Sequence, residues 1–338
     1  MKKDLLIIII LIMTFVTGCK GQKKENEKEI PEKEEITLSE SLFDEDGFCS
    51  KPISMGFGYE NNHNKGFENK NNKITTEIWF ESGDYELEIG ILVFTNGILQ
   101  PVSVEGEEEK TFNIYKVNGN TKTTYNIAFD IVSGNEGEMV RIDTISLLNP
   151  NFKITEKTKE FGLCFASSSL LPCWTECHIL TEAEDGAQSF ELTELSDEVK
   201  EKYIITGADG TIRNNLDSSM NIQYFQDGKE ASKLIVKDNI LEFNMDIYGG
   251  NGEKYNLYVF LNNEPLRCFD GKEYNNVTVT SEKTTKVTAK ADLSGKDIGD
   301  YTQLFTVVVP VDEVKDSDTE VYKLSNIVVD NSWQGEEK

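Results

Sequence analysis

Cys173, Cys177 and His178 lie together in PCWTECH, residues 172–178, and the chain contains only two histidines. Such residues can bind a metal ion, form a disulfide or pair a thiol nucleophile with a base. In a strand, the two thiols would be roughly 13 Å apart, too far to form a disulfide with each other, and His178 would point to the opposite face and could not join them on a metal ion. If Pro172 begins a helix instead, the thiols share one face about 6 Å apart and can form a thiol or metal cluster. The residue types favour the strand.

No common catalytic motif accompanies this stretch: the sequence lacks a phosphate-binding glycine loop, a nucleophile elbow and a His-Glu-x-x-His pair. His63, in ENNHNKG, is typical of a solvated loop. DEDG at 44–47 resembles part of a calcium loop, but Leu42 and Ile53 occupy positions where such a loop has ligands. GADGTIRNNLD at 207–217 indicates an Asp-Gly turn. We expect no cofactor, with a structural calcium ion as the one alternative.

Three tryptophans could contact a ligand, because exposed aromatic faces of extracellular sandwiches often stack on glycans. Trp79 lies within ITTEIWF, which has the pattern of a strand, and we expect it to pack in the core. Trp174 and Trp333 remain candidate ligand-contact residues.

The N-terminus carries the features of a secretory signal. Lys2 and Lys3 precede an apolar run at 5–16, which is shorter than the roughly 20 residues that span a bilayer. The small residues that follow, directly before Cys19, resemble the lipobox of bacterial lipoproteins. The resemblance implies a signal peptide that is removed, a palmitate-bearing Cys19, and a mature protein held on the extracytoplasmic face of the cell membrane.

Residues 19–44 combine dense mixed charge with few apolar residues, which is typical of a flexible tether. The whole chain has 34 basic and 60 acidic residues and a formal charge of −26. Nucleic acid is therefore excluded as a partner, since its binding depends on Lys and Arg. With Cys19 lipidated, an odd number of cysteines remains, so a disulfide-knit scaffold is excluded as well.

An internal repeat organises the rest of the sequence. GDYELEIGILVFTNG at 83–97 matches GGNGEKYNLYVFLNN at 249–263 without a gap. This alignment places Cys268 on Val102, so we expect the Cys268 thiol to be buried and inert. Cys164 has apolar neighbours on both sides, and we expect its thiol to be buried as well.

Alternating Ile, Val, Thr, Phe and Tyr between turn residues predict short antiparallel strands, as in immunoglobulin-like surface proteins, which the body resembles. Asn96 and Gly97 predict a tight hairpin, and LSDEVKEKY at 195–203 predicts the main helix, which Ser196 can cap. The fold prediction is all-β, with two tandem antiparallel sandwiches after the tether. The expected parts are a signal peptide (1–18), a lipidated tether (19–44), a first sandwich (45–155), a divergent connecting segment (156–215), a second sandwich (216–332) and a tail (333–338).

These features predict a lipid-anchored bacterial surface protein that binds, adheres or acts as a spacer and has no catalytic activity. Its expected partners are the membrane, through the anchor, and a surface protein or glycan. One alternative is an extracytoplasmic thiol-dependent hydrolase or transferase that uses Cys173 or Cys177 with His178. Another is a calcium-stabilised carbohydrate-binding module.

Replacement of Cys19 by alanine should release the protein from the membrane, because the thiol that carries the acyl chains is lost. Cell fractionation and incorporation of radiolabelled palmitate measure this, with Cys49→Ala as the control that keeps both label and membrane attachment. Unchanged membrane retention of the Cys19→Ala protein would contradict the prediction.

Overall fold

Alternating apolar and polar residues build the first sheet. The computed structural model describes residues 53–60, 67–158, 167–206, 212–311 and 321–332. In β3 (Lys73–Ser82), Ile74, Ile78 and Phe80 face a core, while Glu77 and Glu81 are exposed. The five strands of this sheet are β1 (Met55–Tyr59), β2 (Asn69–Lys70), β3, β6 (Val102–Val104) and β8 (Lys122–Asp130).

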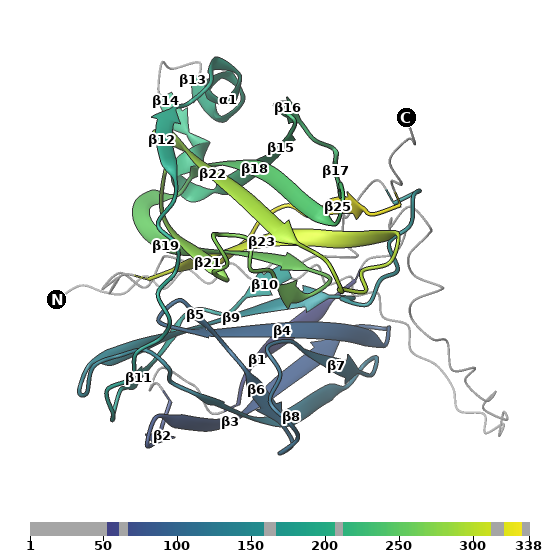
Figure 1. Ribbon diagram of the computed structural model, residues 1–338. Coiled ribbons are helices and arrows are strands. Elements are labelled where there is room, and N and C mark those ends of the chain that lie inside the picture. Colours follow the sequence, from purple (N-terminus) through teal and green to yellow (C-terminus); the bar gives the residue numbers. More distant parts are fainter. Residues whose placement is uncertain (1–52, 61–66, 159–166, 207–211, 312–320, 333–338) are drawn as a thin grey trace, which may run out of the picture. The chain divides into compact units, whose positions relative to one another are not determined.

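A second sheet covers the other side of this core. Its six strands are β4 (Leu87–Thr95), β5 (Ile98–Gln100), β7 (Asn113–Val117), β9 (Met139–Leu148), β10 (Ser167–Ser169) and β11 (Cys173–Glu176). All pairings within both sheets are antiparallel. The two sheets form the first sandwich (Figure 1).

The second sandwich is a sheet of 12 strands that folds over its own core at the hairpin joining β21 to β22. One half holds β12 (Glu191–Glu194), β15 (Met220–Gln226), β16 (Lys229–Glu230), β18 (Ile240–Gly249) and β22 (Lys283–Asp292). The other holds β17 (Lys233–Ile235), β19 (Asn251–Leu261), β20 (Glu264–Pro265), β21 (Tyr274–Thr280), β23 (Tyr301–Pro310), β24 (Tyr322–Lys323) and β25 (Ile327–Asp330). Only the β17–β25 pair is parallel among the described strands. The prediction of an all-β fold with two tandem antiparallel sandwiches is confirmed.

The strand pairings of the first sandwich recur in the second. The pairs β3–β8, β4–β5 and β4–β9 correspond to β18–β22, β19–β20 and β19–β23. Strands β10 and β11 beside β9 correspond to β24 and β25 beside β23. The predicted boundary at residue 155 therefore falls before the strands that complete the second sheet, and the division into domains remains a prediction.

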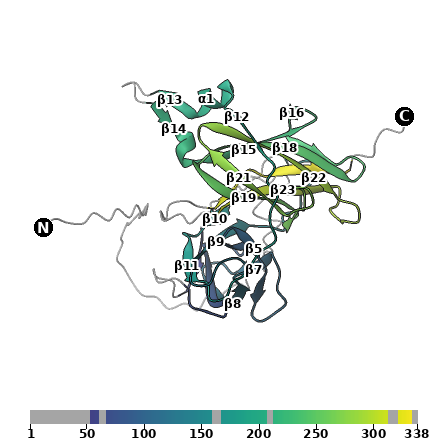
Figure 2. The same cartoon turned by 60° about the vertical axis from the view of Figure 1, so that its left-hand side comes forward.

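The two sandwiches pack on each other through a third apolar core, which we call the seam. β4, β9, β19 and β23 alternate between their own sandwich core and the seam, so both of their faces are buried. The seam contains Leu92, Phe94, Ile145, Leu147, Tyr258, Phe260, Phe305, Val307 and Val309. Figure 1 shows β4 and β9 facing β19 and β23, and Figure 2 shows β9 facing the strands β19 and β23. Burial on both faces explains why these segments are almost continuously apolar rather than alternating.

A hairpin from each sandwich contacts the other across the seam. Asn96 and Gly97 have φ angles of 47° and 77°, which confirms the predicted tight turn. The carbonyl oxygen of Gly97 accepts a 2.9 Å hydrogen bond from the Tyr258 hydroxyl. Conversely, the side chain of Asn263, in the β19–β20 turn, donates a 2.9 Å bond to the carbonyl of Pro150. The docking of the two sandwiches is thus reciprocal.

The connecting segment contributes to both sandwiches. β10 and β11 extend the first, and β12 pairs with β22 of the second. Helix α1 (Asp197–Tyr203) follows, and Ser196 accepts a hydrogen bond from the Val199 amide, which confirms the predicted helix and cap. The hairpin β13 (Ile204–Thr206) and β14 (Ile212–Asn214) and the 3-10 helix η3 (Asn215–Ser218) complete the segment. The described part of the chain holds no helix of sufficient length and apolar character to span a bilayer.

Several predictions concern residues outside the described ranges: the signal peptide at 1–18, Cys19, the tether at 19–44, Trp333 with the tail, and the DEDG stretch. His63 and Cys164 also lie outside them. These predictions stand as made.

Truncation of Phe260 to alanine should lower the free energy of unfolding by about 3–5 kcal/mol, because it opens a cavity in the seam. Phe260 is fully buried and stacks on Phe305 with ring centroids 5.0 Å apart. Denaturant unfolding measures the change. Phe190, which is 38% exposed, is the matched control, and Phe190→Ala should cost below about 1 kcal/mol. Equal losses in the two variants would contradict a role for the seam.

Candidate functional site

The stretch PCWTECH forms an edge strand of the first sandwich. β11 covers Cys173–Glu176 and pairs antiparallel with β9, with Cys173 opposite Ile142. Thr175 and Cys177 are buried and Glu176 is exposed, as expected for side chains that alternate between faces. The preference for a strand over a helix is confirmed.

Cys177 lies in the core of the first sandwich. Its side chain is fully buried and forms no disulfide. The thiol donates a 3.1 Å hydrogen bond to the carbonyl of Ile179. Asn72 fixes this turn, since its side-chain oxygen accepts bonds from the amides of His178 (2.7 Å) and Ile179 (3.2 Å). A substrate could reach this sulfur only if the loop opened. The geometry therefore opposes a nucleophilic role for Cys177.

The structure does not assemble the proposed thiol or metal cluster. Cys173 is half-buried and its thiol donates to the carbonyl of Leu171 at 3.7 Å, whereas His178 is exposed. Among the described residues, no three His, Cys, Asp or Glu side chains converge on a point where a metal ion could bind.

Cys268 is buried, with 2% of its surface exposed, as is Val102 at the matching position of the first repeat. Burial raises the pKa of the Cys268 thiol far above its ordinary value. The prediction of a buried thiol is confirmed for this residue, and its inertness remains a prediction.

Trp79 is not a core residue, and that prediction was wrong. Its neighbour Phe80 faces the core, so Trp79 lies half-buried on the outer face of the first sheet. Its ring covers Gly58, where an added Cβ would lie 2.9 Å from the indole. The Lys122 ammonium lies 5.0 Å from the ring centroid on this face.

Trp174 lines a hollow of about 530 Å³ at one end of the seam, which we call the first hollow. Its walls come from the β4–β5 turn, the loop before β9 and the loop after β11. The two loops are joined by main-chain bonds between Gly134 and Thr181 at 3.1 and 3.2 Å. Met139 and Leu180, which are 53% and 57% exposed, add apolar surface beside Trp174. The first hollow therefore combines an aromatic ring with exposed aliphatic side chains.

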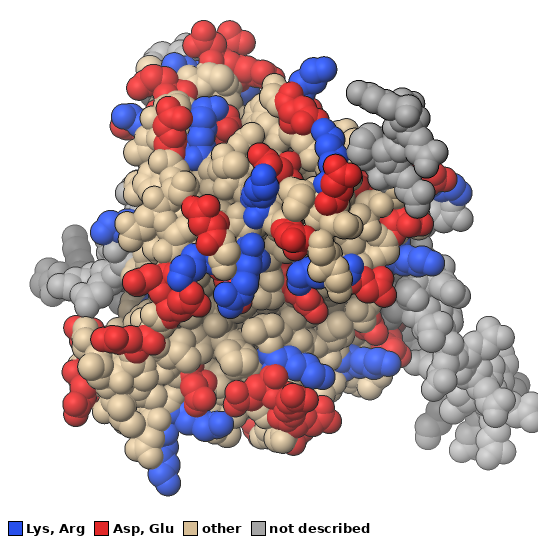
Figure 3. All heavy atoms as spheres, viewed as in Figure 1, with Lys and Arg blue, Asp and Glu red and all other residues tan. Residues whose placement is uncertain are grey.

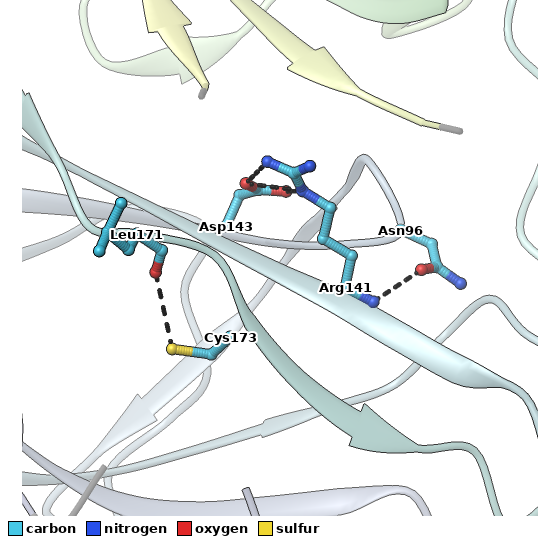
Figure 4. Close-up of polar contacts among 5 residues, drawn as sticks. All are labelled: Asn96, Arg141, Asp143, Leu171 and Cys173. Carbon is cyan, nitrogen blue, oxygen red and sulfur yellow. Dashed lines mark hydrogen bonds and ion pairs between the residues drawn. The ribbon is translucent and has the colours of Figure 1, made fainter. Parts of the chain in front are cut away.

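A buried ion pair supports the first hollow (Figure 4). Arg141, opposite Trp174 on the neighbouring strand, donates to both carboxylate oxygens of Asp143 at 2.8–3.0 Å. Burial raises the pKa of Asp143, and the bonds from Arg141 oppose that shift. The Asn96 side chain accepts a 2.9 Å bond from the Arg141 amide. Figure 4 shows Cys173 on the opposite side of the sheet from this pair.

The rim of the first hollow is acidic. Glu138, Glu182 and Asp185 are exposed, and within the described residues none of them forms a salt bridge. The one basic side chain of the lining is Arg141, which Asp143 neutralises. Elsewhere, on the face seen in Figure 3, acidic and basic side chains are interspersed. The first hollow thus has a local excess of negative charge.

Sequence reasoning found Trp174 and the Asn96 turn but missed the other residues of this site. Met139, Arg141 and Leu180 come from segments that neither the repeat nor any motif connects. One signal existed: an arginine and an aspartate two residues apart in an apolar strand, MVRIDTISLL, share one face and can pair.

No protein-family model matches this sequence, and no curated protein matches it. Among solved structures, the chain is similar at 12% identity to the CsuC–CsuE chaperone-tip adhesion subunit complex of Acinetobacter baumannii, over 74% of this chain and 90% of that one, with a TM-score of 0.17. It is similar at 7% identity to fibronectin(III)-like modules of Clostridium thermocellum CbhA (82% and 95% covered, TM-score 0.18). The C-terminal domain of Streptococcus agalactiae BspA gives 7% identity (83% and 100% covered, TM-score 0.18). Similarities this low carry no argument about function.

Iodoacetamide should alkylate Cys177 in the folded protein roughly a hundredfold more slowly than in the unfolded chain, because reaction requires local opening of the loop. Mass spectrometry of the digested protein measures each thiol separately, and Cys268 is an internal control of equal burial. Fast, pH-dependent alkylation of Cys177 alone would instead support a thiol-dependent enzyme.

Proposed function

We propose that this protein is an extracytoplasmic, lipid-anchored surface protein that binds another macromolecule and catalyses no reaction. The observation that supports binding is the first hollow, where Trp174, Met139 and Leu180 expose apolar surface within a polar, acidic rim. Aromatic and methionine side chains of this kind are enriched in protein interfaces. Met139 begins β9, which is buried on both faces, and Trp174 lies on β11, which pairs with β9, so a rigid sheet supports both side chains.

The charge of the first hollow selects among the expected ligands. An exposed acidic rim attracts basic groups, and the apolar side chains of Trp174, Met139 and Leu180 can contact aliphatic side chains. A protein segment that carries both lysine or arginine and apolar residues fits this combination. A glycan could also stack on Trp174, as expected for a carbohydrate-binding module, but a neutral sugar carries no positive charge to pair with the three rim carboxylates.

The thiol-dependent hydrolase or transferase is the weaker alternative. Such an enzyme requires an accessible thiolate beside a base. Cys177 is fully buried, and the imidazole of His178 belongs to an exposed residue after the end of β11. Attachment to the membrane through Cys19 would place the first hollow outside the cell, where it could meet a protein segment that carries basic and apolar residues.

Substitution of Trp174 by alanine, or reversal of the rim charge by Glu182→Lys, should weaken binding of a basic, apolar peptide by about fivefold or more. The probe is a fluorescein-labelled peptide of alternating lysine and leucine, and fluorescence anisotropy with the purified protein measures its affinity. Binding to the unaltered protein should also weaken with added salt, because the rim contribution is electrostatic.

A second charge reversal controls for the overall charge. Glu282 lies on an exposed turn of the second sandwich, so Glu282→Lys changes the net charge equally and should leave the peptide affinity unchanged. If Glu182→Lys and Glu282→Lys weaken binding equally, the peptide is held by the net negative charge and the first hollow is not its site.

A further inference from the structure

The second sandwich carries a groove of about 610 Å³ on its outer surface, which we call the outer groove. It crosses β12, β15, β18 and β22 on the side of the sheet away from the core, since its residues on β18 alternate with core residues. The floor is polar, and two aromatic residues border it; the residues that matter below are Asn244, Asp246, Lys286, Thr288, Phe190 and Phe225. The outer groove shares no residue with the first hollow.

The two phenylalanine rings of the outer groove are accessible. Phe190 is 38% exposed and Phe225 is half-buried, and neither belongs to an apolar core of the described chain. Tyr224, the neighbour of Phe225, is the residue that packs in the core of the second sandwich. An aromatic ring with a free face can pack against the C–H face of a sugar.

Strand register sets the distance that a ligand must span. Phe225 lies opposite Asn244, and Asn244 lies opposite Thr288 of β22. Phe190 directly precedes Glu191, which begins β12 on the other side of β22. Because neighbouring strands are about 4.8 Å apart, the strands that carry the two rings are roughly 14 Å apart. A single sugar ring cannot contact both, so the ligand that fits is an oligosaccharide.

The floor of the outer groove offers hydrogen-bonding groups that are free to bind hydroxyls. The side-chain oxygen of Asn244 accepts a 2.7 Å bond from the Thr288 hydroxyl, which fixes the amide. Its amide nitrogen has no partner among the described residues, and Asn244 is exposed. One carboxylate oxygen of Asp246 accepts from Lys286 at 2.8 Å, and the other remains an acceptor. The floor therefore holds both a donor and an acceptor for hydroxyl groups.

The charges of this face largely cancel. Lys286 pairs with Asp246, and Lys290 pairs with Glu242 at 2.9 Å beside the outer groove. Glu191, opposite Lys286 in the register, adds a single negative charge to the lining. Unlike the first hollow, the outer groove has only a weak electrostatic preference, which favours a neutral ligand.

The distribution of polarity separates a sugar from a protein partner. A protein interface has its apolar side chains at the centre and its polar ones at the rim. The outer groove has the reverse order, with charged and amide side chains in the middle and the rings of Phe190 and Phe225 at the sides.

We propose that the outer groove binds a neutral oligosaccharide, whose sugar rings pack on Phe190 and Phe225 and whose hydroxyl groups bond to Asn244 and Asp246. The site lies on the second sandwich, and it does not depend on the function proposed for the first hollow.

Saturation-transfer NMR of the full chain tests this proposal, with cellotetraose, maltotetraose, mannotetraose and chitotetraose as probes. At least one of the four should receive saturation, and its affinity should not change with added salt, because the ligand is neutral. Phe190→Ala, Phe225→Ala and Asn244→Ala should each weaken its binding by about fivefold or more. The methyl glycoside of the same sugar should bind about tenfold more weakly than the tetrasaccharide, since it reaches only one ring.

Leu192→Ala is the matched control, because Leu192 is 40% exposed and lies two residues after Phe190 but outside the lining. This variant and Trp174→Ala, in the first hollow, should bind the tetrasaccharide normally. Absence of transfer to all four probes would overturn the proposal, as would normal affinity in the folded Phe190→Ala and Phe225→Ala proteins. Loss of binding in Trp174→Ala alone would place the sugar in the first hollow and refute the outer groove as its site. Melting temperatures verify folding, and if one variant fails to fold, the others decide.

Discussion

Burial of four strands on both faces is the constraint on which the rest of this structure depends. β4, β9, β19 and β23 each supply side chains to a sandwich core and to the seam, so no residue of their central parts can be polar without a partner. At the ends of the seam, buried polar side chains have such partners: Arg141 pairs with Asp143 at one end, and Gln303 donates to the carbonyl of Pro150 at the other. The first hollow lies at the Arg141 end, and a second hollow of about 500 Å³, lined by Gln303 and Tyr301, lies at the other end, where the apolar packing of the seam stops.

Reciprocity explains why the two hollows are related. Each sandwich extends one hairpin to the other: Gly97 contacts Tyr258 of β19, and Asn263 contacts Pro150 shortly after β9. Each end of the seam is therefore built from parts of both repeats. Arg141 and Gln303 occupy equivalent positions in the two repeats. A substitution at such a position changes the polar chemistry at one end of the seam without changing the apolar packing in its centre. An acidic hollow with Trp174 and a nearly neutral one with Tyr301 are compatible with the same backbone.

Local rules predicted much of the fold from sequence. Alternation in β3 and β8, the Asn-Gly turn and the Ser196 cap are all decided by neighbouring residues, as was the strand at PCWTECH. The seam was missed because a continuous apolar run predicts that a strand is buried but does not indicate which other strands cover it. Trp79 was misplaced because the pair Trp79–Phe80 offers two aromatic residues on opposite faces. The first hollow joins segments from Asn96 to Val311, which no local pattern connects.

The order of the strands along the chain has a consequence for synthesis. The outer faces of β4 and β9 are complete once residue 148 has emerged, yet their cover, β19 and β23, extends to residue 310. For the time needed to add that length, an apolar surface of the size of the seam faces solvent or a chaperone. A protein secreted in unfolded form would therefore have to delay aggregation at this sheet until its second half arrives.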